Sequence, residues 1–274
     1  MYYTLNDKEY WVQDQGSGTP VVLLHGFTGS SRVWDELVVN WKSKYRTISL
    51  DLPGHGKSKV NTPISMEGFC KDITELLEKL SIPKAIFVGY SMGGRVALSF
   101  AMLYPNKVHS LVLESASPGL HQSHEQVARQ AKDELLAKML ENEGLSTFID
   151  YWTTIPLFES QKRLPKQKQL AIRSERINQT ETGLASSLRG MGTGNQPSWW
   201  DQLAGLTIDV LLIVGELDEK FVKIAKEMDE IFKYSQLQLV ADAGHAVHVE
   251  QTQKFVTIVS DFIDKKEQDN EWRT

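Results

Sequence analysis

The stretch that decides the fold is AIFVGYSMGGRVALSFAMLY, residues 85–104. It joins an apolar run, KAIFV, to the helix-favouring sequence GRVALSFAMLY through Gly89-Tyr90-Ser91-Met92-Gly93. A G-x-S-x-G sequence between a strand and a helix is typical of a nucleophile elbow, because small residues around the serine let the chain reverse sharply and expose the hydroxyl. Unpaired N–H groups in the first helical turn would stabilise negative charge beside Ser91. An ordinary glycine-rich turn is the alternative, and the flanking strand and helix disfavour it.

Short apolar runs recur on both sides of this segment and are predicted to be buried strands. These runs are Val21–Leu24, Thr47–Leu50, Ala85–Val88, Leu111–Leu113 and Val210–Val214. Helical periods separate several of them, including 66–80, for which Ser65 is the expected N-cap, and 93–104. Alternation of this kind predicts an α/β fold with a mostly parallel central sheet flanked by helices.

The pattern changes between residues 118 and 202, where the sequence is charged and helix-favouring, as in HEQVARQAKDELLAKML (124–140). We therefore predict a core made of residues 1–117 and 203–274, with a helical cap, 118–202, inserted into it. The cap should lie over the carboxyl ends of the strands, where open α/β sheets bind ligands. The last ten residues, KKEQDNEWRT (265–274), are expected to form a solvated tail.

Composition excludes several classes of function. A formal net charge of -5 offers no excess of basic residues for a nucleic-acid partner. Cys70 is the only cysteine, so the chain forms no internal disulfide and no multi-thiolate metal site, and a reducing cytoplasm fits. The first residues lack the features of a secretory signal, and no apolar run approaches the roughly 18 residues of a membrane span. We expect a cytoplasmic protein without membrane insertion; no feature specifies its oligomeric state.

A serine nucleophile or base needs a histidine, which a carboxylate must orient, and in this arrangement the order along the chain is serine, acid, histidine. Asp218 follows the strand VLLIVG, and His245 lies in the loop after the last strand, LQLV. Glu216 is the alternative acid. His248 is the alternative histidine, although a packing role in the last helix suits it better.

The segment His25-Gly26-Phe27 follows an early strand, at the position where such folds supply an oxyanion donor. We assign the two donors to the backbone N–H groups of Phe27 and Met92, and His25 a structural role. Gly54-His55-Gly56-Lys57-Ser58 ends like a phosphate-binding loop, but Asp51 stands where that loop requires its first glycine. No histidine pair has the spacing of a zinc protease, so no metal is predicted.

The whole chain resembles the 2-succinyl-6-hydroxy-2,4-cyclohexadiene-1-carboxylate synthases of menaquinone biosynthesis, which have the α/β-hydrolase fold. The resemblance includes HGFTGS, DLPGHGKS and VGYSMGGR, of which HGF, DLPGHGKS and the triad are shared across many α/β hydrolases. ESASPGL, YWTTIPLF, LRGMGTGNQPSWW, GELDEKF and AGHAVHVE extend the resemblance, and the first three of these are the more particular to the family.

The resemblance implies specific site residues. The triad falls on Ser91, Asp218 and His245, and the oxyanion donors on Phe27 and Met92. The implied substrate-binding residues are Tyr90, Arg95, Arg129, Trp152 and Arg173, with Arg176 as an alternative to Arg173. Arg95 lies four residues after the serine, on the same helical face, where a cation suits an anionic substrate; an exposed or structurally paired arginine is the alternative.

The implied reaction is a lyase reaction. Pyruvate is eliminated from 5-enolpyruvoyl-6-hydroxy-2-succinyl-cyclohex-3-ene-1-carboxylate, without cofactor or metal, and the serine acts as a base. The partner is thus a small polycarboxylate. One rival is a serine hydrolase of an ester, lactone or carbon-carbon bond, which would form a stable Ser91 adduct. The other is a non-catalytic ligand-binding receptor on the same fold, whose output would survive loss of Ser91.

Overall fold

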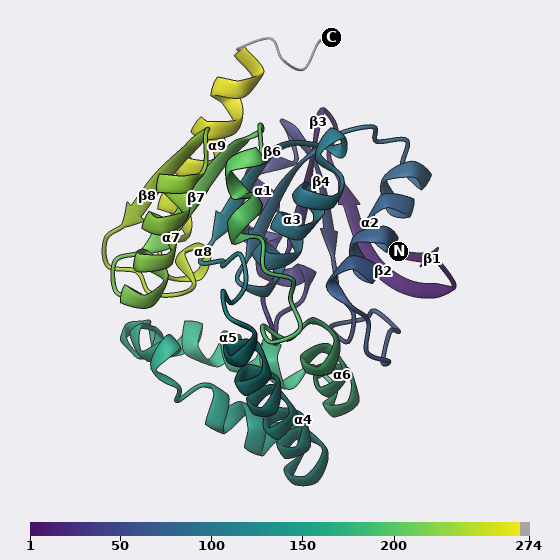
Figure 1. Ribbon diagram of the computed structural model, residues 1–274, viewed down its shortest axis with the longest axis vertical. Coiled ribbons are helices and arrows are strands. Elements are labelled where there is room, and N and C mark those ends of the chain that lie inside the picture. Colours follow the sequence, from purple (N-terminus) through teal and green to yellow (C-terminus); the bar gives the residue numbers. More distant parts are fainter. Residues whose placement is uncertain (269–274) are drawn as a thin grey trace.

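Eight strands form one sheet in the computed structural model, which describes residues 1–268 (Figure 1). Their order across the sheet is β1-β2-β4-β3-β5-β6-β7-β8; β2 is antiparallel to β1 and β4, and all other neighbours are parallel. The strands are β1 Tyr2–Leu5, β2 Lys8–Gln15, β3 Thr19–Leu24, β4 Tyr45–Leu50, β5 Ala85–Tyr90, β6 Val108–Glu114, β7 Asp209–Gly215 and β8 Ser235–Val240. The predicted α/β fold is confirmed, and each predicted strand lies within one of these.

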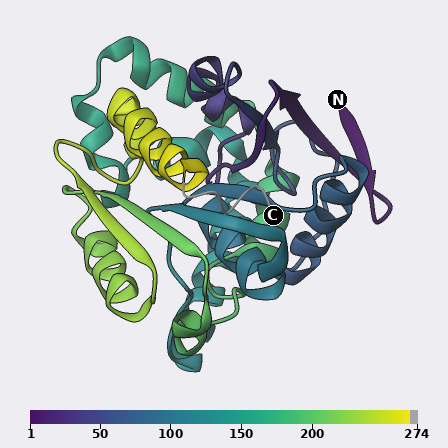
Figure 2. The ribbon, with the colours of Figure 1, turned by 90° about the horizontal axis from the view of Figure 1, so that it is seen from above.

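The central strands are apolar on both faces because helices cover both sides of the sheet. In β3, Val22 and Leu24 pack on the side of α2 and α3, whereas Val21 and Leu23 pack on the side of α1 and α9. Figure 2 shows these two helical layers, with α1 (purple) and α9 (yellow) on one side and α2, α3 and α7 on the other. The helices are α1 Asp35–Trp41, α2 Met66–Lys79, α3 Met92–Leu103, α7 Glu219–Ile231, α8 Val247–Glu250 and α9 Thr252–Gln268, with 3-10 turns η1 Ser31–Trp34, η2 Pro105–Lys107 and η4 Trp200–Gly205.

Two local features refine the expectations from sequence. Ser65 caps α2 as predicted, because its hydroxyl accepts a hydrogen bond from Gly68 N–H. The hairpin of β1 and β2 was not predicted; its two-residue turn, Asn6-Asp7, has positive φ at both positions, which suits a tight hairpin. The expected C-terminal tail is helical as far as Gln268, and residues 269–274 lie outside the described part of the chain.

Between β6 and β7 the chain forms the helices that lie together at one end of the sheet in Figure 1. They are α4 Ser123–Trp152, η3 Pro156–Arg163, α5 Lys166–Ile177 and α6 Glu181–Met191. Residues 118–202 contain no strand. Gly144, at φ 82°, interrupts α4 and divides it into two helical segments. A separate apolar cluster, which includes Leu140, Phe148 and Leu184, holds α4 against α6.

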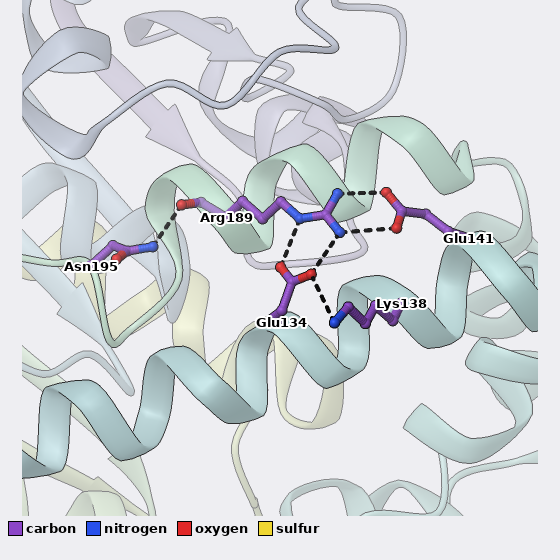
Figure 3. Close-up of polar contacts among 5 residues, drawn as sticks. All are labelled: Glu134, Lys138, Glu141, Arg189 and Asn195. Carbon is purple, nitrogen blue, oxygen red and sulfur yellow. Dashed lines mark hydrogen bonds and ion pairs between the residues drawn. The ribbon is translucent and has the colours of Figure 1, made fainter.

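Charged residues also link these two cap helices (Figure 3). Arg189 of α6 donates two hydrogen bonds to Glu134 of α4, at 2.8 and 3.1 Å, and its Nη2 lies 2.9 Å from Glu141 Oε2. Lys138 lies 3.8 Å from Glu134. Planar, paired contacts of this kind suit a guanidinium, but the partners are about one-third exposed, so the apolar cluster contributes more to the stability of the cap.

Candidate active site

The serine elbow lies where β5 ends and α3 begins. Ser91 has φ 52° and ψ -109°, a strained conformation for a residue with a side chain, and such strain is often found at functional sites. Its N–H donates to Glu114 O of β6 at 2.8 Å. Gly93 passes so close to β3 that a Cβ atom there would lie 2.1 Å from Leu24 O. The elbow is therefore fixed against the two strands beside β5, and it projects the serine hydroxyl beyond the sheet edge.

Three side chains from distant parts of the sequence meet at this elbow. His245 Nε2 lies 2.9 Å from Ser91 Oγ, and His245 Nδ1 lies 2.7 Å from Asp218 Oδ2. Asp218 follows β7 and caps α7, since its Oδ1 accepts a hydrogen bond from Phe221 N–H. His245 lies between β8 and α8, and both side chains are buried. With Nδ1–H donated to the carboxylate, Nε2 is free to accept the serine proton.

The alternative acid and histidine lie elsewhere. Glu216 is exposed. His248 lies in the short helix α8. Its Nδ1 donates to Glu114 Oε2 at 2.8 Å, and its backbone N–H donates to Glu114 Oε1 at 2.9 Å. Both partners are buried, and the His248 ring packs 4.8 Å from Trp34. His248 and Glu114 therefore hold the chain after His245 against the end of β6.

Two backbone N–H groups are available beside Ser91. Those of Phe27 and Met92 donate no hydrogen bond to another residue within 1–268. Buried histidines shape the loop that carries Phe27: His25 Nε2 accepts from Leu52 N–H at 2.9 Å, and His55 Nε2 accepts from Thr28 N–H at 3.2 Å. Burial lowers the pKa of His25 to about 4 and that of His55 to about 3, so both rings are neutral acceptors near pH 7. His25 thus has the structural role assigned to it.

A cavity of about 410 Å³ opens onto the triad. Its lining includes the predicted residues Phe27, Ser91, Met92, Arg95, Arg129, Trp152 and His245. Arg95 is buried and donates to Met191 O at 2.8 Å and to Gln196 Oε1 at 3.2 Å. Burial, and then repulsion by Arg129, lowers its pKa to about 10, so it remains a cation near pH 7. Arg129 uses its Nε on Asp133 Oδ1, at 2.8 Å.

Tyr90 lines a second cavity beside the one that contains Ser91. This neighbouring cavity, of about 360 Å³, shares Phe27 with the first cavity but does not include Ser91. The Tyr90 ring packs 5.4 Å from His245 and 4.6 Å from His248. Both side chains flank Gly26, since a Cβ atom there would lie 2.5 Å from Tyr90 Cε1 and 3.5 Å from Ser91 Cβ.

The register of the cap arginines needs correction. Arg173 is partly exposed, pairs with Asp150 through Nη2 at 2.6 Å, and lines neither of these two cavities. Arg176 lines the Tyr90 cavity and is buried, with its guanidinium carbon 4.3 Å from the centre of the Phe158 ring. Its Nη2 donates to Gln161 Oε1 at 3.3 Å, and no acid within residues 1–268 forms an ion pair with it. Arg176, the alternative considered from sequence, therefore takes the place given to Arg173.

Two lysines at the catalytic cavity, Lys220 and Lys223, were not singled out from sequence. Lys220 lines the cavity two residues after Asp218, within the segment GELDEKF. The sequence signal that could have identified Lys220 was its position in the first helical turn after the predicted catalytic acid, Asp218. Among the described residues, no cluster of histidine, cysteine or acidic side chains suits a metal ion, and no helix has the length and apolarity to cross a bilayer.

Known proteins are similar to this chain in both sequence and structure. The family model for the alpha/beta hydrolase fold matches residues 19–252. The chain is 43% identical, over 93% of its length and 94% of the relative's, to a protein of Bacillus subtilis named as a putative 2-succinyl-6-hydroxy-2,4-cyclohexadiene-1-carboxylate synthase. Among solved structures it is similar to MenH from S. aureus, with a TM-score of 0.89 and 34% identity over 94% of this chain and 98% of that one. A thermophilic esterase from Thermogutta terrifontis has a TM-score of 0.86 at 25% identity, covering 97% and 98% of the two chains.

Proposed function

The chain belongs to the α/β-hydrolase fold family and, within it, to the 2-succinyl-6-hydroxy-2,4-cyclohexadiene-1-carboxylate synthases, and from this membership we propose how it acts. It is a lyase of menaquinone biosynthesis that eliminates pyruvate from 5-enolpyruvoyl-6-hydroxy-2-succinyl-cyclohex-3-ene-1-carboxylate. The observation that carries the proposal is the hydrogen-bonded chain Ser91–His245–Asp218 at a cavity that also holds Arg95 and Arg129. The hydrogen-bonded chain supplies a base, and the two arginines suit a polycarboxylate substrate.

The reaction begins with a proton transfer. Ser91 Oγ takes the proton α to the succinyl ketone while its own hydroxyl proton passes to His245 Nε2, 2.9 Å away. Asp218 stabilises the imidazolium that forms, because its carboxylate receives Nδ1–H at 2.7 Å. The electron pair left on carbon becomes an enolate. Its oxygen would be held by the N–H groups of Phe27 and Met92, since an oxyanion hole recognises developing negative charge rather than one reaction.

The elimination itself needs no water. The enolate electrons shift into the ring, a conjugated diene forms, and the carbon-oxygen bond to the enolpyruvyl group breaks. The leaving enolpyruvate takes up a proton and becomes pyruvate, which balances the proton removed at the start. Because the protein's part is a base, an oxyanion hole and a fixed substrate orientation, no step calls for a cofactor or metal.

Arginine side chains bind the carboxylates of the substrate in this proposal. Arg95 is buried, and no acid within residues 1–268 forms an ion pair with it, so a carboxylate that enters the cavity meets a poorly hydrated cation. Arg129 keeps its two terminal nitrogens for a ligand, since only Nε is bonded to Asp133. Trp152 contributes a flat wall that is packed against Phe27. Tight binding at the carboxylates would align the acidic carbon with Ser91.

The neighbouring cavity provides a further arginine for substrate binding. We assign Arg176, next to Tyr90, to a further carboxylate of the substrate, because the two cavities adjoin at Phe27. Replacing Arg176 with methionine should lower kcat/KM for pyruvate release by about tenfold to a hundredfold, the effect of losing a charge-assisted hydrogen bond. Replacing Arg173, which lines neither cavity, with methionine is the matched control and should change kcat/KM less than about twofold. Equal effects of the two substitutions would contradict the assignment.

The proposed function is tested by giving purified protein the enolpyruvyl substrate and following pyruvate with a coupled dehydrogenase. One pyruvate should appear for each diene formed, and the diene should be visible by its absorbance. The similarity to a solved esterase makes ester hydrolysis the alternative outcome. Turnover of simple aryl esters without pyruvate release would replace the lyase by the hydrolase.

We further propose that the reaction takes place in the cytoplasm. The one cysteine, Cys70, is fully buried in the core beside α3, where its sulfur contacts Val96 O. Burial raises the pKa of the Cys70 thiol, which keeps it protonated and unreactive. The fold therefore depends on no disulfide and is compatible with a reducing compartment.

A further inference from the structure

The wall of the catalytic cavity carries more positive charge than Arg95 and Arg129 account for. Lys220 and Lys223 of α7 line the same cavity, and Lys220 lies in the first helical turn, which Asp218 caps. Arg129 comes from the cap helix α4, whereas Lys220 comes from the core, so the two cations approach the cavity from different layers. Repulsion by Arg129 lowers the pKa of both Arg95 and Lys220, so its charge acts on each of them.

The acids that line this cavity are already engaged. Glu125 accepts a hydrogen bond from Gln122 N–H, at 3.1 Å, as part of the capping box of α4. Glu227 lies 3.5 Å from His121 Nε2. Lys220 forms no ion pair or hydrogen bond with any residue in the described part of the chain, and its nearest aromatic contact is Phe221, at 5.4 Å. An anion that enters the cavity thus meets Lys220 without displacing an internal partner.

The position of Lys220 is fixed by the catalytic acid. Asp218 caps α7 by accepting Phe221 N–H at 3.3 Å, so the first helical turn, which carries Lys220, is held in register with the triad. Loss of hydration lowers the pKa of Lys220, and repulsion by Arg129 and Lys132 lowers it further, while Asp218 acts in the opposite direction. Like charges held together in this way favour the binding of an anion between them.

We propose that Lys220 and Arg129 bind one carboxylate of the substrate between them, so that the anion links core helix α7 to cap helix α4. This inference rests on the proposed function, whose substrate has three carboxylates. Arg95 and Arg176 are then left for the other two. Lys220 is a specificity residue: it favours polycarboxylates over neutral esters and leaves the proton transfer to the triad.

The experiment compares Lys220→Gln with Lys226→Gln, which removes the same charge from an exposed position of α7 that does not line the cavity. Lys220→Gln should raise KM for the enolpyruvyl substrate by about tenfold and leave kcat within about twofold. Lys226→Gln should match the unmodified protein, and Lys220→Arg should recover most of the affinity. Adding salt should shrink the difference, because the site is open to solvent.

A double-mutant cycle tests whether one carboxylate is shared. If it is, Lys220→Gln combined with Arg129→Gln should raise KM by clearly less than the product of the two single effects. An unchanged KM, a fall in kcat alone, or fully independent effects would each overturn the proposal; a fall in kcat alone would indicate that Lys220 acts on Asp218 instead.

Calorimetry with tricarballylate, a simple tricarboxylate, separates this inference from the proposed function. The probe should bind the unmodified protein and Lys226→Gln alike, and Lys220→Gln more weakly by about tenfold. If the unmodified protein released no pyruvate, the proposed function would fail whatever this titration gave. If it released pyruvate but Lys220→Gln bound tricarballylate equally well, only the role of Lys220 would fail.

Discussion

Replacing Ser91 with alanine should lower kcat for pyruvate release by at least about a thousandfold, the scale of loss seen when a triad member is removed. The reason is geometric: the Ser91 hydroxyl is the group that faces the cavity, and His245 Nε2 is held 2.9 Å behind it by Asp218. Without the hydroxyl, the imidazole is too far back to meet the substrate carbon directly. Stability should change little, because the side chain removed is small and only partly buried.

The matched control for this substitution is Ser115→Ala. Ser115 lines the same cavity and, like Ser91, has positive φ, but its hydroxyl has no hydrogen-bond partner within residues 1–268. Its loss should change kcat by less than about threefold. Single-turnover measurement of pyruvate at saturating substrate gives the chemical step for both variants. A Ser91→Ala protein that kept its kcat would show that Ser91 is not the base.

The same reaction mixture distinguishes a base from a nucleophile. A serine that only moves a proton leaves no covalent product, so the intact mass of the protein should remain unchanged during turnover. A mass increase located at Ser91 would instead indicate an acyl enzyme, as in an esterase. The oxyanion hole serves either chemistry, and the difference lies in what the bound carboxylates place beside the hydroxyl.

The fold and the triad could be predicted because both follow from local sequence rules. Apolar runs such as Val210–Val214 are long enough to be central strands and too short to be buried helices. Parallel strands end at a common edge, so Ser91, Asp218 and His245, each placed after a strand, had to approach one another there. Chain order and strand ends therefore determined the site without any knowledge of side-chain packing.

The substrate pocket depends on packing that sequence does not encode locally. Arg173 and Arg176 are nearly one turn apart on α5, so their periodicity does not distinguish them. What separates them is the surroundings: Asp150 binds one at the surface, and the Phe158 ring covers the other. The β1–β2 hairpin went unpredicted for a related reason: its strand residues are mixed with charged ones at the sheet edge, and its turn lacks glycine.

Tyr90 and Ser91 are consecutive residues but line different cavities. Tyr90 is the last residue of β5 and lines the cavity that contains Arg176, whereas Ser91 begins the elbow with φ 52°. His245 contacts both of them: its Nε2 lies 2.9 Å from Ser91 Oγ, and its ring centre lies 5.4 Å from that of Tyr90. A substrate that extended into both cavities would pass beside Phe27, which lines both of them. Ser91 lines only one of the two cavities.

The elbow should tolerate no side chain at Gly93. A Cβ atom there would lie 2.1 Å from Leu24 O, 2.4 Å from Leu24 C and 2.6 Å from His25 O, all backbone atoms of β3 and the loop that follows it. Side chains can rotate out of such a clash, but a central strand bonded on both sides to β4 and β5 cannot. We expect Gly93→Ala to lower the free energy of unfolding by at least about 3 kcal/mol, the upper end of overpacking effects.

Urea denaturation measures this loss, and Gly205→Ala is the matched control. Nothing lies within 4 Å of a Cβ atom at Gly205, so the same chemical change should shift the free energy of unfolding by less than about 1 kcal/mol. Any Gly93→Ala protein that folds should also lose turnover, because moving α3 away from β3 separates the N–H groups of Met92 and Phe27. Wild-type stability in Gly93→Ala would mean that α3 does not approach β3 as closely as the elbow requires.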